Sequence, residues 1–155
     1  MEIIDYKEEY QPNFEKLNKA WLNKYFSVEP IDEEVLSNPE EFILKQGGQI
    51  LFMKHNGQII GTVALKFVDD NTFELTKMAV DDKFQGLGAG KLLCNAAIKR
   101  AKNIGATSLI LFSETSLAAA IHIYRKLGFK EIPIEKGKYH RANIMMKLEL
   151  ENKKA

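Results

Sequence analysis

The sequence predicts a single α/β domain in which a mixed, mostly antiparallel sheet carries helices on both faces. Strand-like and helix-like segments alternate along the 155 residues. Asn56-Gly57 separates two strand-like runs and is a strong two-residue hairpin signal. A glycine-rich turn over 85–91 joins a strand-like run to a helix-like run. A chain of this length makes one domain, so we expect residues 1–150 to form it and 151–155 to be a loose tail.

The first third of the chain predicts a short strand over 2–5 and two helices. Apolar side chains recur at helical spacing over 12–25, namely Phe14, Leu17, Trp21 and Tyr25. The second helix is expected to start after Asn38, with Asn38 as its cap and Glu41 completing a capping box. Gly47-Gly48 is expected to end it.

The remaining elements follow in a regular order. Three strands are predicted over 49–54, 58–68 and 72–80, and a helix then runs from the glycine-rich turn to Ile104. The apolar run 107–112 is typical of a buried parallel strand. A helix ending at Gly128 and a final antiparallel pair, 129–132 with 142–149, complete the order.

Composition narrows the class of protein. A hydrophobic content of 45% and a charged content of 28% are ordinary for a globular protein. A net charge of +1 argues against nucleic acid or an anionic membrane surface as partner. No apolar run approaches the roughly 20 residues of a membrane span. The acidic N-terminus lacks a signal-peptide pattern and Cys94 is the single cysteine, so we expect a cytoplasmic protein, either a monomer or a homodimer. His55, His122 and His140 lack metal-ligand spacing, so no metal is expected.

The glycine-rich turn is the most informative stretch: Gln85, Gly86, Leu87, Gly88, Ala89, Gly90 and Lys91. Three glycines let the backbone bend tightly and approach a ligand. Free amides at the start of the following helix form a phosphate site, and Lys91 adds a cation. A P-loop is excluded, because Gln85 replaces its first glycine and Leu92 its Ser or Thr.

Two alternatives remain open for this turn. One is a strand-to-helix turn without a ligand, and the other is a dinucleotide-binding turn. Gly86 and Gly88 fit the dinucleotide pattern, although Lys91 stands at its third glycine and residues 81–84 separate it from the strand. Glu114, after a later strand, has the place of a ribose-binding acid.

A third pattern, Q/R-x-x-G-x-G/A, matches Gln85, Gly88 and Gly90. Together with the run A-I-H-I-Y-R-K-L-G-F from Ala120 to Phe129, it makes the chain resemble the GNAT superfamily of acetyl-CoA-dependent N-acetyltransferases. The order of elements between the two motifs is also that of the family. The resemblance implies acetyl transfer from acetyl-CoA, directly and without a covalent enzyme intermediate, to a primary amine of a small molecule or a peptide.

The resemblance also implies a set of cofactor-binding residues. It implies that the strand over 72–80 separates from the strand over 107–112, as the matching strands do in the family, and that the pantetheine arm of CoA enters the gap. Many members have an asparagine where this chain has Leu117, so Ser116 is expected to replace its contact. Lys126, with Arg125, is expected near the 3′-phosphate of CoA. The full set is Met78, Ala79, Val80, Gln85, Gly86, Leu87, Gly88, Ala89, Gly90, Lys91, Ser116, Leu117, Ala120, Tyr124 and Lys126.

Acetyl transfer requires a base, because an alkylamine titrates near pH 10.4 and is protonated at neutral pH. Glu74 stands where many family members place a catalytic glutamate, acting directly or through a water. Strand alternation puts it on one face with Thr76, Met78 and Val80 unless a bulge intervenes, and leaves Lys77 on the other face. The alternative for Glu74 is a solvated surface charge.

The leaving thiolate requires a proton, and Tyr124 stands where the family places a tyrosine that reaches the sulfur. The alternative for Tyr124 is a core aromatic residue. A backbone amide near Met78 or Ala79 is expected to bind the oxyanion. Cys94 lies inside a predicted helix without an evident base, so it is expected to be a core residue rather than a nucleophile.

The acceptor site is expected between the first two helices and the last hairpin. Phe26, Tyr139 and Arg141 are the candidate substrate-binding residues, and Trp21 is expected in the core. A non-catalytic acyl-CoA-binding module is the alternative function. Such a module would keep the glycine-rich turn but would not need Glu74 and Tyr124.

Overall fold

The computed structural model describes residues 1–134 and 140–151. Its strands are β1 Glu2–Asp5, β2 Gln49–His55, β3 Gln58–Asp69, β4 Thr72–Val80, β5 Ser108–Ser113, β6 Lys130–Ile132 and β7 Ile144–Glu149. Its helices are α1 Gln11–Tyr25, α2 Pro30–Ser37, α3 Ala89–Asn103 and α4 Ala118–Lys126. Short helical turns are η1 Glu8–Tyr10, η2 Glu40–Leu44 and η3 Asp82–Phe84.

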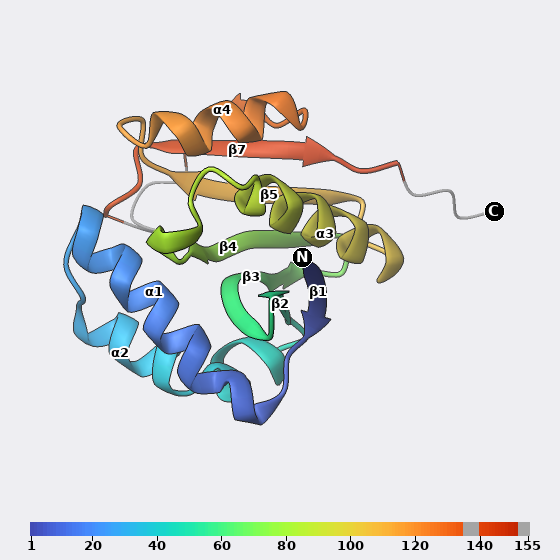
Figure 1. Ribbon diagram of the computed structural model, residues 1–155. Coiled ribbons are helices and arrows are strands. Elements are labelled where there is room, and N and C mark those ends of the chain that lie inside the picture. Colours follow the sequence, from blue (N-terminus) through green and yellow to red (C-terminus); the bar gives the residue numbers. More distant parts are fainter. Residues whose placement is uncertain (135–139, 152–155) are drawn as a thin grey trace.

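The strands form one seven-stranded sheet in the order β1-β2-β3-β4-β5-β7-β6 (Figure 1). Every pair is antiparallel except β4 with β5, which is parallel. The parallel pairing is short, since it begins at Thr72 with Ser108 and ends at Glu74 with Ile110. Beyond Glu74 the two strands separate, as the family resemblance implied, and a gap opens in the middle of the sheet.

Helices cover both faces of the sheet, which confirms the predicted fold class. On one face α1, α2 and η2 pack through Phe14, Leu36 and Ile43 against alternate residues of β2, including Phe52. On the other face α3 and α4 pack against the opposite residues of β2, such as Leu51 (Figure 1). The alternation of β2 side chains between two apolar layers explains why this strand is apolar on both faces.

The predicted turns are largely confirmed. Asn56 and Gly57 have φ of 49° and 78° and form the hairpin between β2 and β3. Both angles are positive, which a two-residue hairpin turn of type I′ requires. Gly105 and Gly128, with φ of 92° and 102°, follow α3 and α4 as expected for helix ends.

The region between α1 and β2 differs from the prediction. Helix α2 was not predicted, and its capping contact joins the backbone N–H of Glu29 to Asp32 Oδ2 at 2.8 Å. The predicted capped helix after Asn38 is instead the single π-helical turn η2, without a side-chain cap. Eight residues are too few to show a helical period in the sequence. A helix this short is not stable alone, so α2 depends on its tertiary contacts. Gly47 and Gly48 do end η2, and their N–H groups donate to Leu44 and Ile43 carbonyls at 3.1 and 2.9 Å.

None of the helices in residues 1–134 and 140–151 has the length and apolar character that a bilayer crossing requires.

Candidate functional site

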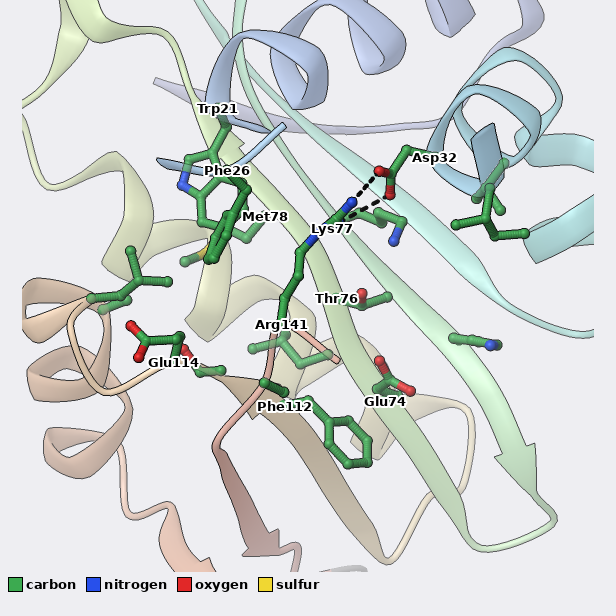
Figure 2. A pocket seen from close by; sticks show the side chains of 18 of the residues that line it. Trp21, Phe26, Asp32, Glu74, Thr76, Lys77, Met78, Phe112, Glu114 and Arg141 are labelled. Atoms are coloured by element: carbon green, nitrogen blue, oxygen red, sulfur yellow. Dashed lines mark hydrogen bonds and ion pairs between the residues drawn. The ribbon is translucent and has the colours of Figure 1, made fainter. Parts of the chain in front are cut away.

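A cavity of about 840 Å³ opens where β4 and β5 separate (Figure 2). Segments far apart in the chain line it: the end of α1 and the residues after it, α2, η2, the middle of β4, the end of β5, the start of α4 and residues 140–142. The lining includes Trp21, Phe26, Asp32, Glu74, Thr76, Lys77, Met78, Phe112, Leu117, Ala120, Tyr124 and Arg141. The cavity therefore joins the motif-bearing half of the chain to its N-terminal helices.

A bulge interrupts β4 at the cavity. Thr62 of β3 pairs with Ala79 and Ala64 pairs with Thr76, so β4 holds one residue more than β3 over this stretch. Lys77 and Met78 have no partner on β3, and the pairing of β4 with β5 has already ended at Glu74. Lys77 and Met78 are thus not paired in either ladder, at the place where an oxyanion-binding amide was expected.

The bulge corrects the predicted faces of β4. Lys77 adopts a φ of 55°, which a residue with a side chain rarely does. Simple alternation does not hold across it, and Lys77 lines the same cavity as Glu74 instead of the opposite face. Burial lowers the pKa of the Lys77 ammonium, which the charges of Glu74 and Asp32 only partly oppose. The prediction that Lys77 lies on the face of β4 opposite Glu74 is therefore wrong.

Glu74 lies deep in the cavity wall. It is 2% exposed and pairs in register with Lys66 on β3 and Ile110 on β5. A solvated surface charge would not be buried to this degree, so that alternative does not hold. Figure 2 shows Glu74 on the same strand as Thr76 and Lys77 in the wall of the cavity.

Tyr124 lies across the cavity from β4. Its side chain is 9% exposed, lines the cavity and contacts the Phe129 ring, with centroids 5.9 Å apart. Burial, with a smaller effect of Cys94, raises the pKa of the phenol above its usual value. The phenol is consequently a proton donor at neutral pH. Tyr124 packs in the core and also reaches the cavity, so the two roles considered for it are compatible.

Cys94 is a core residue, as predicted. It is fully buried on α3, its Sγ lies 3.3 Å from Met78 Sδ, and burial raises the pKa of its thiol to about 12. The thiolate that a nucleophile requires is therefore not populated near neutral pH.

The glycine-rich turn forms a bare backbone surface at the start of α3. Gly86 and Gly88 have φ of 84° and 78°, and Gly88 is the N-cap of α3. A Cβ placed on either glycine would meet nothing within 4 Å. Gln85 Nε2 donates to the Val80 carbonyl at 3.4 Å and ties the turn to the end of β4. The turn can bring main-chain N–H groups to an anion without steric obstruction.

The loop before α4 is held by Glu114. Its carboxylate accepts hydrogen bonds from the Ser116 hydroxyl and N–H and from Asn143 Nδ2, and the Ser116 side-chain bond above all lowers its pKa. The Ser116 hydroxyl is thus already bonded within the loop, where a contact with pantetheine was expected. Leu117, the N-cap residue of α4, lines the cavity with an apolar side chain.

Arg141 joins the segment before β7 to α2. Its guanidinium donates to Glu29 Oε2 at 2.5 Å, to Asp32 and to the Ser27 carbonyl, and it lies over the Phe26 ring. Burial works to raise the pKa of Asp32, but the hydrogen bonds from Arg141 and from the Glu29 N–H outweigh it and lower the pKa. The hydrogen bond between Arg141 and Asp32 also raises the pKa of the Arg141 guanidinium. Its charge is therefore already paired, and a substrate carboxylate would have to displace Glu29 or Asp32.

The predicted residues fall into three groups. The cavity brings together Glu74, Met78, Leu117, Ala120, Tyr124, Phe26 and Arg141. Outside its lining are Ala79, Val80, Ser116, Lys126 and the turn from Gln85 to Lys91. Tyr139 lies outside the described residues. Trp21 was expected in the core, and it is partly buried against the core cluster that contains Phe14 and Phe52. It also lines the cavity, with its ring 5.6 Å from that of Phe26.

Lys77, Asp32 and Phe112 line the cavity and were not predicted to be part of a site. No local sequence pattern identifies these residues, because a bulge places Lys77 at the cavity and a short helix places Asp32 there. In the part of the chain that the structure describes, no group of three or more His, Cys, Asp or Glu side chains could hold a metal ion.

Comparison with known proteins agrees with the geometry. The family model described as Acetyltransferase (GNAT) family matches residues 7–129. The N-acetylaspartate synthetase of Xenopus tropicalis is 30% identical over 101 residues, covering 64% of this chain and 37% of that protein. The [ribosomal protein bS18]-alanine N-acetyltransferase of Haemophilus influenzae is 36% identical over 96 residues, 61% of this chain and 64% of that protein. The chain thus spans little more than a third of the length of the first of these relatives.

Solved structures share the whole fold. A GNAT-family acetyltransferase from Staphylococcus aureus Mu50 superposes with a TM-score of 0.84 at 25% identity, covering 96% of this chain and 98% of that one. The yncA protein of Salmonella typhimurium, solved with acetyl-CoA, has a TM-score of 0.76 at 21% identity, covering 100% and 96%.

Proposed function

The chain belongs to the acetyltransferase (GNAT) family, and from this premise we propose that it transfers the acetyl group of acetyl-CoA directly to a primary amine of a small molecule or a peptide. One observation carries the proposal. Glu74 on β4 and Tyr124 on α4 are separated by 50 positions in the chain, yet both line the cavity at the β4–β5 gap. A module that only binds acyl-CoA needs neither group there.

Each part of the site has a role in this reaction. The glycine-rich turn and the start of α3 bind the diphosphate of the cofactor through main-chain N–H groups. The thioester lies in the gap, with its carbonyl oxygen towards the main chain of the bulge near Met78. The turn and the bulge both act through the backbone, with positive φ at Gly86 and Gly88 in the turn and at Lys77 in the bulge.

The chemical step removes two protons from the acceptor. Glu74 accepts the first proton from the ammonium, directly or through one water, and the neutral amine nitrogen then attacks the thioester carbon. The tetrahedral intermediate collapses with cleavage of the C–S bond, Tyr124 donates its proton to the sulfur, and the second proton leaves the nitrogen and restores the phenol. Its raised pKa keeps the phenol protonated until that step. Cys94 takes no part, because its buried thiol does not ionise.

The relatives suggest which amines to test. One is named for the synthesis of N-acetylaspartate and another for the acetylation of an alanine of ribosomal protein bS18. A small amino acid and a peptide N-terminus are therefore the first acceptors to try, followed by polyamines and simple alkylamines.

The test is release of CoA thiol from acetyl-CoA in the presence of each amine, combined with melting of the protein with each cofactor. We expect thiol release with at least one amine. Acetyl-CoA at about 100 times its dissociation constant should add about 2.7 kcal/mol to the free energy of unfolding. A melting shift without thiol release for any amine would favour the acyl-CoA-binding module. A shift with NAD and none with acetyl-CoA would favour a dinucleotide site.

A further inference from the structure

Three basic side chains gather on the acceptor side of the cavity: Lys66 from β3, Lys77 from β4 and Arg141 from the segment before β7. The charges of Lys66 and Arg141 both act to lower the pKa of Lys77, so each lies close enough to Lys77 to repel its ammonium. Figure 2 shows Lys77 and Arg141 beside Asp32 on this wall. The same cavity is also lined by four carboxylates, those of Glu29, Asp32, Glu74 and Glu114, so the cations are not in excess there.

Two of these carboxylates bind Arg141 and not Lys77. Asp32 and Glu29 both accept hydrogen bonds from Arg141. Within residues 1–134 and 140–151, Lys77 forms no hydrogen bond or ion pair with a carboxylate, and only longer-range attraction by Glu74 and Asp32 acts on it. Lys77 is thus a partly exposed amine that lines the cavity, and Asp32, one of the two carboxylates that attract it, is already bonded to Arg141.

The backbone of Lys77 is also strained in a way that serves no sheet pairing. Its φ of 55° puts a long side chain in the left-handed region, where a glycine or asparagine would be easier. Such strain persists at functional sites, where the surrounding structure holds it. The bulge turns the Lys77 side chain into the cavity that Glu74 lines, three positions earlier on the same strand.

We propose that the acceptor is a primary amine that also carries a carboxylate, and that Lys77 binds this carboxylate while the amine lies towards Glu74. This inference rests on the proposed acetyl transfer and names the class of its acceptor. A carboxylate of the acceptor would form a charge-assisted hydrogen bond with the Lys77 ammonium. Ile31, Val35 and Phe42 leave an apolar wall for the rest of the acceptor.

The experiment compares matched pairs of amines that differ by one carboxylate: leucine with 3-methylbutylamine, phenylalanine with phenethylamine, and aspartate with β-alanine. The ratio of kcat/KM within each pair is independent of the fraction of active enzyme. We expect the wild-type protein to prefer the member with the additional carboxylate by about tenfold or more in at least one pair. Lys77→Met should remove most of this preference, mainly by raising KM, and Lys77→Arg should retain part of it.

Lys66→Met is the matched control, because it removes a second cation of the same cavity and should leave most of the preference intact. Lys77→Asn is a second variant, since asparagine tolerates the left-handed backbone and so separates loss of charge from loss of fold. Melting curves with acetyl-CoA establish that each variant still folds and binds the cofactor.

The outcomes separate the two proposals. Absence of thiol release with every amine would contradict acetyl transfer itself. Turnover of simple amines without a carboxylate preference in any pair would leave acetyl transfer standing and overturn the inference about Lys77. The same conclusion follows if the preference survives in both Lys77→Met and Lys77→Asn, or if only Lys66→Met removes it.

Discussion

The proposed cofactor side and the proposed acceptor side of the site are built from different parts of the polypeptide. On the proposed cofactor side the exposed groups belong to the main chain, at Gly86 and Gly88 with positive φ and in the first turn of α3. On the proposed acceptor side the cavity is lined by side chains, such as those of Phe26, Lys77 and Arg141, from segments far apart in sequence. A site made of backbone tolerates most changes of side chain, whereas one made of side chains can change its ligand by a few substitutions.

The largest expected effect belongs to Glu74, which stands between the two sides. It is the only acidic residue of β4. Glu74→Gln keeps the shape of the side chain and removes its basicity. Turnover should fall by about 10²- to 10⁴-fold near neutral pH. The loss should shrink as the pH rises, because more of the amine then arrives deprotonated.

Binding of acetyl-CoA provides the control for this variant. If the cofactor side is independent of Glu74, the melting shift with acetyl-CoA should equal that of the wild-type protein. Wild-type turnover in Glu74→Gln at pH 7 would mean that another group, such as His140 or Tyr139, takes the proton.

The same contrast explains what the sequence could predict. The glycine-rich turn and the motif around Tyr124 lie within short runs, so local pattern and family resemblance identified both. Asp32 could not be identified, because its partner Arg141 lies 109 positions away and its helix is too short to show a period. Lys77 was assigned to the wrong face, because alternation predicts faces only in a regular strand. The bulge is visible only in the register of β4 against β3.

Tyr124 is expected to show the next largest effect. Tyr124→Phe removes the phenol and keeps the ring that packs against Phe129. If Tyr124 protonates the leaving thiolate, turnover should fall by about 10²-fold with an unchanged melting temperature. Steady-state kinetics and thermal melting together test this. Unchanged turnover would limit Tyr124 to its packing role.

Gly88 tests whether the cofactor side depends on exposed backbone. Gly88→Val adds a branched side chain where nothing lies within 4 Å at present, in the space where the diphosphate is expected. We expect KM for acetyl-CoA to rise by about tenfold or more, equivalent to about 1.4 kcal/mol or more of binding free energy.

Gly57→Val is the matched control for backbone strain. Gly57 has the same φ of 78° and is equally open, but it lies in the hairpin between β2 and β3. Both variants should lose stability through strain, and only Gly88→Val should lose affinity for acetyl-CoA. Equal effects on KM in the two variants would indicate that strain, and not contact with the cofactor, is responsible.

The smallest effect concerns the ion pairs that hold the acceptor side together. Asp32→Asn weakens the link from α2 to Arg141 and should lower the free energy of unfolding by about 1–3 kcal/mol at pH 7, because it leaves the Arg141 guanidinium short of a charged acceptor. Denaturant unfolding at several pH values measures this. Asp5→Asn, which disrupts the exposed pair of Asp5 with Arg100, is the control and should cost much less.

The pH dependence of this loss identifies its cause. The pKa of Asp32 is lower in the folded protein than its usual value of 3.8. A depressed pKa contributes stability that is fully present above the unfolded value and is lost as the pH falls through the folded value. The difference between wild type and Asp32→Asn should therefore be constant from about pH 7 to about pH 5 and shrink below about pH 4. A difference that stays constant in acid would mean that packing of α2, and not the charge of Asp32, holds this side of the cavity in place.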